Sequence, residues 1–346
     1  MYVCVYAFAR GGGQEDGADM RHAARHEAPS ADAAMSDNIT DQHRLIGRRG
    51  SAPGEFNGPQ GLAYLRDGSM VAVDFGNHRV QCVRPDREVV WCVGSEGSGE
   101  GQFNGPVGVA VTAEGKIYVT DFNNHRIVEL RARDGSWVRC FGRKGKGAGE
   151  FDRPAGIACG PGDTIVVVEW GNHRVQVLDA TGAFLRFFGS EGSGAGELSR
   201  PWGVAVTAAS DIVVCDTNNH RLAVFTWEGA AVRSVGGQGS AEGQFDCPVF
   251  VAVDGAGHLL VSDYGNHRVQ EFDAAYGFVR SRGREGSGAG ELKGPTGVAV
   301  DAAGNVAVAE EGNDRVQVFA RAAVGVQQVV CVCVCVCVLM CMCMCV

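Results

Sequence analysis

Five histidines recur in one short sequence motif, and imidazole is both a frequent metal ligand and an acid–base group. The motif reads DFGNHRVQCV from Asp74, and its near-copies begin at Asp121, Glu169, Asp216, Asp263 and Glu310. The histidines are His78, His125, His173, His220 and His267. In each copy an acidic residue also precedes an arginine by five positions, as Asp74 precedes Arg79, so an ion pair is a second candidate. These residue types allow a metal centre, buried ion pairs or hydrogen-bonded turns.

The spacing of the copies indicates which elements carry these residues. Successive copies begin 47 or 48 residues apart, and such a period is typical of a repeat protein. Each unit contains a glycine-rich loop, a proline and four short apolar segments, which predict four strands. A four-stranded antiparallel unit of about 47 residues is typical of one β-propeller blade. The first strands follow Pro59, Pro106, Pro154, Pro201, Pro248 and Pro295, so we predict six blades.

The two ends of the array predict how the ring closes. The last copy ends at Phe319 without a fourth strand, whereas a spare strand sequence, HRLIGRRGSAPGEF, occupies 43–56 before the first blade. An N-terminal strand that completes the last blade would pair two bare strand edges. We therefore predict an all-β, six-bladed propeller over 42–321, preceded by a disordered segment over 1–41 and followed by a low-complexity Val/Cys/Met tail over 322–346.

The ring geometry argues against a shared metal ion. Equivalent positions in different blades lie too far apart for several histidines to reach one ion at bond lengths near ~2.1 Å. We interpret the histidines as structural residues that pack or hydrogen-bond at a turn, and we predict no metal and no cofactor.

Two further positions of the motif have a predicted structural role. The second residue after the acidic one is always Gly or Asn, which predicts a left-handed backbone; the six are Gly76, Asn123, Gly171, Asn218, Gly265 and Gly312. The next residue is always Asn, whose amide is predicted to hydrogen-bond the turn backbone; the six are Asn77, Asn124, Asn172, Asn219, Asn266 and Asn313.

The repeated sequence resembles the NHL repeat. Asn-His-Arg followed by Val, Ile or Leu, the Pro-x-Gly-Val-Ala-Val strand before it and the VQVF after it carry the resemblance over about 43–320. The departures are Glu169, Glu310, Asp314 and Phe250, the last in place of a strand glycine. The resemblance implies a six-bladed propeller. In animals such propellers often form the substrate-recruiting or RNA-binding end of RING and B-box ubiquitin ligases, but this sequence shows no Cys/His framework for a RING or B-box, so we expect any ligase role to be in trans.

Residues that vary between copies are the better guide to function, because the repeated ones are explained by structure. Two variable positions fall at the same end of every blade. The residues predicted to form a partner-binding face there are Phe75, Phe122, Trp170, Tyr264, Trp202, Gln60 and Thr296. Exposed aromatic clusters anchor protein partners. The alternative is that these rings pack on neighbouring blades.

Charge bears on nucleic-acid binding. The net charge is −9, which does not suit a general nucleic-acid binder, and we predict no DNA partner. The exception is a basic patch at Arg143, Lys144 and Lys146. It is either a solvated loop or an RNA-binding patch whose binding would be sensitive to salt.

An enzymatic function remains an alternative. The six innermost strand sequences contain no His, Asp or Glu, which weighs against the zinc-dependent amidating lyases and the gluconolactonase-like metal hydrolases, two enzyme families of similar shape. The glycine-rich loops superficially resemble phosphate-binding loops, yet each leads into a strand and not into a helix. We interpret them as connections between blades. A site built from loops at the channel mouth stays open as the enzyme hypothesis.

The cysteines and the tail bear on location. Seven of the 14 cysteines are scattered without a C-x-x-C pair, and seven alternate with apolar residues in the tail. The apolar run over 329–346 reaches the lower limit for a membrane span, although its alternation favours an aggregating strand. We expect a monomeric, cytoplasmic, non-catalytic platform for a protein or peptide, with membrane association if the tail acts as an anchor.

Overall fold

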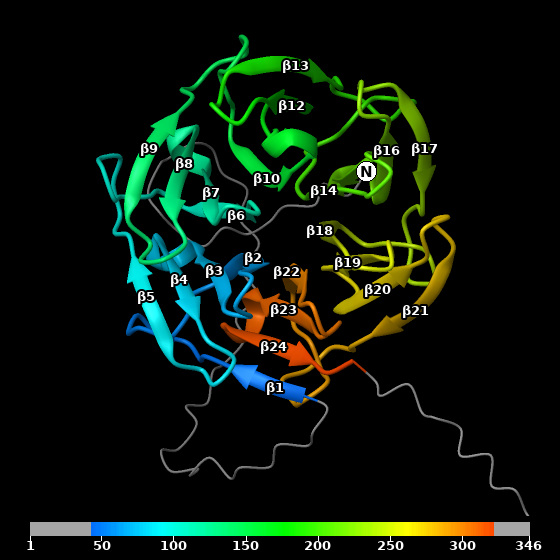
Figure 1. The fold of residues 1–346 in the computed structure, drawn as a ribbon. Helices are drawn as coiled ribbons and strands as arrows, with labels where there is room; N and C mark the ends of the chain where they lie inside the picture. Colours follow the sequence, from blue (N-terminus) through cyan, green and yellow to red (C-terminus); the bar gives the residue numbers. More distant parts are fainter. Residues whose placement is uncertain (1–42, 322–346) are drawn as a thin grey trace, which may run out of the picture.

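The computed structural model describes residues 43–321, which form six four-stranded antiparallel sheets around a central axis (Figure 1). The predicted disordered segment and the predicted low-complexity tail lie outside the described residues. Within residues 43–321 there is no helix long and apolar enough to cross a membrane.

Each sheet is one propeller blade, and in blades 1 to 5 the strands follow chain order from the axis outwards. Blade 1 contains β2 (Pro59–Tyr64), β3 (Met70–Asp74), β4 (Arg79–Val83) and β5 (Val89–Val93). Blade 2 contains β6 (Pro106–Val111), β7 (Lys116–Asp121), β8 (Arg126–Arg131) and β9 (Trp137–Phe141). Blade 3 contains β10 (Pro154–Cys159), β11 (Ile165–Glu169), β12 (Arg174–Leu178) and β13 (Phe184–Phe188).

The second half of the ring repeats this order. Blade 4 contains β14 (Val204–Val206), β15 (Ile212–Asp216), β16 (Arg221–Phe225) and β17 (Ala231–Val235). Blade 5 contains β18 (Pro248–Val253), β19 (Leu259–Asp263), β20 (Arg268–Phe272) and β21 (Phe278–Arg282). Blade 6 contains β22 (Pro295–Val300), β23 (Val306–Glu310) and β24 (Arg315–Phe319), and its fourth strand is β1 (His43–Ile46).

Short 3-10 turns complete the elements. Four of them link the second and third strands of a blade: η1 (Phe75–Asn77), η2 (Phe122–Asn124), η4 (Thr217–Asn219) and η5 (Glu311–Asn313). The fifth, η3 (Pro161–Asp163), links β10 and β11.

The N-terminal clasp predicted from the sequence is confirmed. Strand β1 pairs antiparallel with β24, with His43 opposite Phe319 and Ile46 opposite Val316. Figure 1 shows the blue β1 beside the orange β24 at the outer rim of blade 6. The last blade is therefore built from both ends of the ring, so that neither β24 nor β1 is left without a neighbour on that side.

The hydrophobic core lies between neighbouring blades. The second strands are buried along their whole length, as in β3 with the sequence MVAVD, except at Lys116 of β7, because each sheet is covered on both faces by its neighbours. One cluster joins residues of blades 1 and 2, such as Val73 and Val119, and another joins blades 6 and 1. This packing accounts for strands that read as continuous apolar runs.

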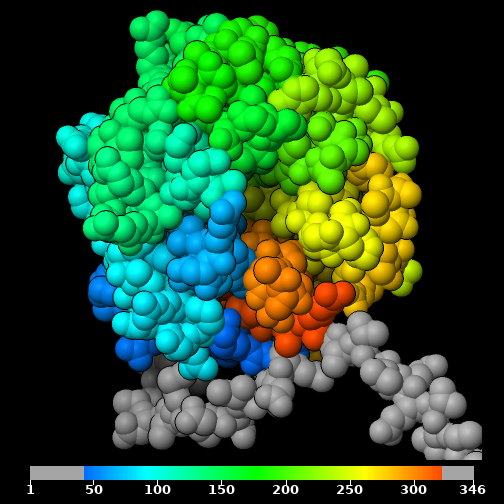
Figure 2. Space-filling view, viewed as in Figure 1, coloured from blue at the N-terminus to red at the C-terminus, as the bar shows by residue number. Residues whose placement is uncertain are grey.

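The innermost strands approach each other closely around the axis. The N–H of Gly156 in β10 donates to the carbonyl of Trp202 at 2.6 Å, and a Cβ at Gly156 would lie 2.4 Å from that oxygen. This contact explains the strand glycine of the Pro-x-Gly sequence. Figure 2 shows a hollow at the centre of the face in view, where the blades converge.

Candidate functional site

The acidic residue and the arginine of the motif form a buried ion pair within each blade. In blade 1, Nε of Arg79 donates to Oδ2 of Asp74 at 2.8 Å, and the Asp74 side chain is fully buried. The other guanidinium nitrogens donate to carbonyls of the preceding glycine-rich loop, Ser51 at 2.5 Å and Ala52 at 2.8 Å. Burial raises the pKa of the Asp74 carboxyl, and the hydrogen bonds that it accepts oppose this shift. The predicted pair is thus confirmed, and it fixes a loop to its blade.

The asparagine of the motif serves the same loop. The amide of Asn77 donates to the carbonyl of Gly50 and to Oδ2 of Asp74, both at 2.8 Å. Asn124, Asn172, Asn219, Asn266 and Asn313 make the equivalent bonds. The prediction that these amides bond the backbone of their own turn was wrong, because their backbone acceptor belongs to the loop that enters the blade.

The histidine joins one blade to the next. Nδ1 of His125 accepts the N–H of Arg153 at 3.0 Å, and the histidines of the other four copies make the same bond to the following blade. In the sixth copy, Oδ1 of Asp314 accepts the N–H of Gly58 at 2.8 Å. The interpretation of the histidines as hydrogen-bonding structural residues is therefore confirmed.

The left-handed residue of the bend is this histidine and not the predicted Gly or Asn. The φ angle of His125 is 55°, and the other four histidines and Asp314 have φ between 50° and 54°. At the Gly/Asn position the constraint is a close approach: the N–H of Gly76 donates to the carbonyl of Asn57 at 2.9 Å, and a Cβ there would lie 2.6 Å from the Asn57 amide. In blade 2, the backbone N–H of Asn123 donates to the carbonyl of Asn104 in the same way, at 3.1 Å. The Asn123 side-chain amide also donates to Oδ1 of Asn104 at 3.3 Å.

We predict that the His125 bond makes stability depend on pH. Burial is the largest cause that lowers the pKa of His125 below its usual 6.5, and Lys144 and Arg153 add to it. Because the unfolded chain binds a proton first, stability should be full above about pH 6.5 and fall as the pH drops below it. His125→Asn keeps an acceptor in a residue that tolerates this backbone and removes the titration, so its stability should fall less between pH 7.5 and 5.5 in urea unfolding.

A second substitution controls for loss of the bond itself. His125→Ala leaves the N–H of Arg153 without its acceptor and should lower stability at pH 7.5 by roughly 0.5–1.5 kcal/mol, with a smaller loss at pH 5.5, where protonation of His125 already removes the acceptor. If His125→Asn followed the same pH dependence as the unchanged protein, His125 would not be the titrating group.

The variable positions do come together at one end of the blades, which we call the bend face. It is formed by the bends after the second strands and the residues just before the first strands. The expectation that its aromatic rings are all presented to solvent was wrong. Phe122 and Trp202 are 5% and 1% exposed, and Gln60 and Thr296 are 2% and 0% exposed. Trp202 lies 5.6 Å from Phe122, ring centre to ring centre.

Three predicted face residues keep a partly exposed ring, namely Phe75, Trp170 and Tyr264, which pack against the same apolar cluster. Burial raises the pKa of the Tyr264 hydroxyl, and Glu311 beside it adds to the shift. Packing on neighbouring blades, the alternative left open by the sequence, therefore describes Phe122 and Trp202 fully and these three rings in part; the Trp170 ring lies 6.2 Å from that of Phe122.

Two arginines that were not predicted as site residues lie against the Trp170 ring. The guanidinium of Arg153 lies 5.1 Å from the centre of the Trp170 ring, and that of Arg200 lies 4.7 Å from it. Arg153 is exposed and Arg200 is half-buried. Both distances fall within the range of cation–π contacts, so blade 3, together with Arg200 at the start of blade 4, presents a cationic surface with an aromatic centre.

The backbone at these two arginines is left-handed. The φ angle is 51° at Arg153 and 44° at Arg200. The equivalent residues of blades 1, 2 and 6 are Gly58, Gly105 and Gly294, with φ of 61°, 60° and 56°. Glycine adopts this conformation without the cost that a side chain brings, so the fold favours glycine where these arginines stand.

The predicted basic patch lies beside this surface. Arg143 pairs with Glu150 at 2.7 Å, as Arg284 pairs with Glu291 in a later loop. Lys144 and Lys146 are exposed. Lys144 acts electrostatically on His125, which bonds the backbone of Arg153, so Lys144 extends the cationic surface of blade 3.

One group of potential metal ligands is found among residues 43–321. It consists of His220, Asp246 and Cys247, with ligand atoms within 4.8 Å of one another. Nδ1 of His220 accepts the N–H of Cys247 at 3.1 Å, and Sγ of Cys247 lies 3.4 Å from Oδ1 of Asp246. These contacts hold the three residues at the junction of blades 4 and 5, and we do not assign a metal ion to them.

Comparison with known proteins agrees with this repeated geometry. The model of the NHL repeat matches six segments, which are residues 56–83, 103–130, 151–178, 198–225, 245–272 and 292–319. The chain belongs to the NHL repeat family. Each matched NHL segment begins at the buried Phe or Leu of a glycine-rich loop and ends in the third strand of its blade, so it includes the ion pair, the bend and the histidine, or Asp314 in the sixth.

Solved structures show the same fold at low sequence identity. Virginiamycin B lyase from Staphylococcus aureus has a TM-score of 0.54 and 14% identity over 81% of this chain and 98% of its own. A gluconolactonase from Xanthomonas campestris has a TM-score of 0.59 and 16% identity over 82% and 95%. A chain of the nidogen/laminin complex has a TM-score of 0.53 and 16% identity over 69% and 92%. No curated protein matches.

Proposed function

We propose that this NHL propeller is a non-catalytic binding platform and that an acidic segment of a protein or peptide binds its bend face at blade 3. The observation that carries the proposal is the pair of arginines on Trp170. The partner's carboxylates would pair with Arg153 and Arg200, and its apolar groups would contact the indole ring.

Backbone conformation supports a binding role for these arginines. A residue other than glycine in the left-handed region costs of order 1–3 kcal/mol, and such residues cluster at functional sites. Glycine serves the fold at the same position in three blades, and Cys247 occupies it in blade 5. Two adjacent blades with arginine at this position are therefore not explained by the needs of the fold.

Charge supports an acidic partner. The chain carries a net charge of −9, yet Arg153 and Arg200 both lie near one ring. A local positive surface on an acidic protein attracts negatively charged segments, while the net negative charge of the rest of the molecule repels them.

The biological role, the oligomeric state and the location in this proposal rest on the sequence. Substrate recruitment for a ubiquitin ligase acting in trans is the role that the NHL resemblance suggests. A monomeric state and a cytoplasmic location belong to the same proposal, and light scattering and fractionation test them directly.

The test uses substitutions that other blades already contain. Arg153→Gly and Arg200→Gly introduce the residue of blades 1, 2 and 6, so the variant should stay folded or gain stability. Acidic peptides with one aromatic residue should bind the unchanged chain, with affinity reduced about tenfold or more in the double variant, measured by calorimetry and by the tryptophan fluorescence of the chain. Trp170→Thr, which copies Thr217 of blade 4, should have a similar effect.

The outcome also separates the alternative functions. Equal binding by the double variant would remove blade 3 as the binding surface. RNA binding that falls steeply with salt and is lost on changing Arg143, Lys144 and Lys146 to alanine would favour the RNA function. The likeness to lyases and to a gluconolactonase lies in the fold, and the fold alone does not decide between catalysis and binding.

A further inference from the structure

A glutamine recurs two residues after the arginine of the motif, in four of the six blades. Gln81, Gln176, Gln270 and Gln317 are all completely buried. In blade 3, the N–H of Gly149 donates to Oε1 of Gln176 at 3.1 Å, while Nε2 donates to the carbonyl of Glu150 at 2.6 Å and to Oε1 of Glu169 at 2.8 Å. Each of these blades thus contains a slot with one donor and two acceptors, filled by its own carboxamide.

Blade 4 keeps the slot but lacks the glutamine. The residue at this position is Ala223. The N–H of Gly196, which corresponds to Gly149, has no hydrogen bond in the part of the chain that the structure describes. The carbonyl of Glu197 accepts a bond from Arg221 at 3.0 Å, and Oδ2 of Asp216 accepts from Arg221 at 2.8 Å. The donor and both acceptors of the slot are therefore present.

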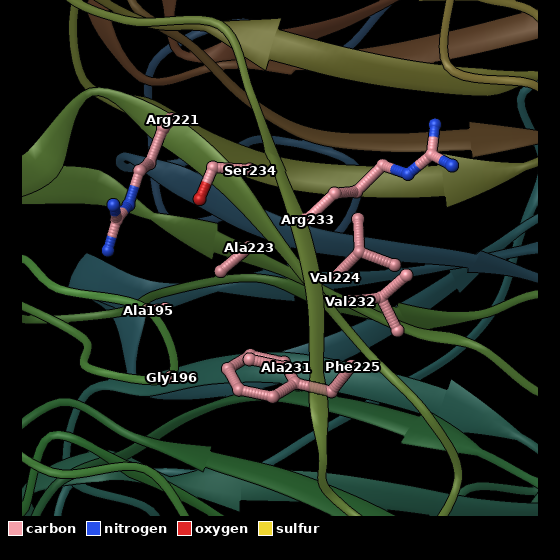
Figure 3. Close-up of a pocket in the computed structure, with 10 residues that line it drawn as sticks. All are labelled: Ala195, Gly196, Arg221, Ala223, Val224, Phe225, Ala231, Val232, Arg233 and Ser234. Atoms are coloured by element: carbon pink, nitrogen blue, oxygen red, sulfur yellow. The ribbon is translucent and has the colours of Figure 1, made fainter.

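The space left by the missing side chain remains open. A cavity is lined by Ala195, Gly196, Arg221, Ala223, Phe225 and Ser234. Figure 3 shows these residues on one side of β17, while Val224, Val232 and Arg233 extend to the other side. The cavity therefore lies against the strand face from which a glutamine would project in the other blades.

The outer strand of blade 4 leaves this cavity accessible. Ser234 stands opposite Ala223 in the register of β17 and β16. In blade 3 the same position holds Phe187, which stacks on Arg174 at 4.5 Å. The Arg221 side chain is accordingly 16% exposed, against 7% for Arg174. A small side chain at the rim opens the slot to the outside.

We propose that the blade 4 cavity binds a primary carboxamide, supplied as the glutamine side chain of a partner chain. Its oxygen accepts the N–H of Gly196, and its NH₂ donates to the carbonyl of Glu197 and to Asp216, as the intramolecular glutamines do in four blades. A carboxylate would bring its charge against both acceptors and is excluded. The exposed Ala231 and Ser234 of the edge strand β17, which stand opposite Phe225 and Ala223, provide adjoining surface for the rest of the partner segment. This site is separate from the bend face and goes beyond the function proposed above.

The test follows backbone amides of the ¹⁵N-labelled full chain by NMR during titration with propionamide. The Gly196 resonance should shift and saturate with a Kd on the order of millimolar, whereas Gly149, whose slot is filled by Gln176, should not move. Propionate, of nearly the same shape, should produce no saturable shift. A Gly196 resonance that does not saturate with propionamide, or that responds equally to propionate, would overturn the proposal.

Two variants copy other blades and control for the cavity. Ala223→Gln supplies the side chain of blades 1, 3, 5 and 6, and Ala223→Val supplies Val128 of blade 2. Both should keep a dispersed spectrum and reduce the response to propionamide about tenfold or more, because the slot is filled from within. An unchanged response in a folded Ala223→Gln variant would show that propionamide binds outside the blade 4 cavity, and it would overturn the proposal.

A peptide arm tests the source of the carboxamide. Two short extended peptides differ in one central residue, Gln or Glu, and end in N-methylamides so that the glutamine is their sole primary carboxamide. The Gln peptide should bind at least about tenfold more tightly than propionamide because it also contacts β17. Equal affinity of the two peptides, or no gain over propionamide, would overturn the assignment to a partner chain.

Discussion

Arg126→Met is expected to lower the free energy of unfolding by about 3–5 kcal/mol, the usual cost of leaving a buried charge without its partner. The Asp121 side chain is fully buried, and Nε of Arg126 donates to it at 2.8 Å. The same guanidinium donates to the carbonyls of Ser98 at 2.6 Å, Gly99 at 3.2 Å and Gln102 at 2.8 Å. Methionine fills similar space and makes none of these bonds, so the loop between blades 1 and 2 loses its attachment as well. Urea unfolding followed by circular dichroism measures the loss.

The pH dependence identifies the cause of the loss. Burial raises the pKa of Asp121, and removal of Arg126 raises it further, so the folded variant binds a proton more readily than the unfolded chain. The deficit should therefore be largest at neutral pH and shrink as the pH falls towards about 4. Arg133→Met, at a side chain that is 92% exposed, should change stability by less than about 0.5 kcal/mol. An Arg126→Met variant as stable as Arg133→Met would show that the pair contributes nothing.

The features predicted correctly from the sequence are those for which all six repeats give the same information. Six copies of one motif determine the strand count, the blade size and the position of the Asp121–Arg126 pair across a hairpin. The clasp followed from counting, since one strand was missing at Phe319 and one was spare at His43. Periodicity alone carries these inferences, because each copy confirms the others.

The wrong predictions concern contacts between repeats. A position that is always Gly or Asn has two physical explanations, a left-handed backbone or a close approach by another segment. At Gly76 the second holds, since the Asn57 carbonyl lies against it. The left-handed residue is His78, whose side chain bonds the next blade. The burial of Trp202 is equally non-local, because it depends on how six first strands meet at the axis.

The arginines on Trp170 were missed although the sequence contains a signal for them. Aligned copies have glycine at Gly58, Gly105 and Gly294, which suggests a left-handed backbone, and arginine at Arg153 and Arg200 breaks that pattern. Their convergence on one ring could not be predicted, because it joins residues from two blades. The Ala223 slot has a similar signal: alanine in place of a recurrent glutamine.

The second large effect is expected when the clasp strand is removed. A chain that begins at residue 48 lacks β1, whereas a chain that begins at residue 43 keeps it, and the five additional residues are the whole difference. Strand β1 pairs with β24 over four residues, buries Ile46 to 3% exposure, and its Arg44 donates to the carbonyl of Pro85 in blade 1 at 2.7 Å.

Loss of β1 leaves the outer edge of β24 without a partner, which should affect both stability and association. The backbone hydrogen bonds contribute about 0.5–1.5 kcal/mol each and Ile46 about 1.5–3 kcal/mol, so the shorter chain should lose roughly 4 kcal/mol or more. The uncovered edge of β24 should also pair with a second molecule, which light scattering would detect as dimers or larger species. If both chains unfolded at the same urea concentration and remained monomeric, the clasp would be dispensable and the ring would be held by contacts between blades 6 and 1 alone.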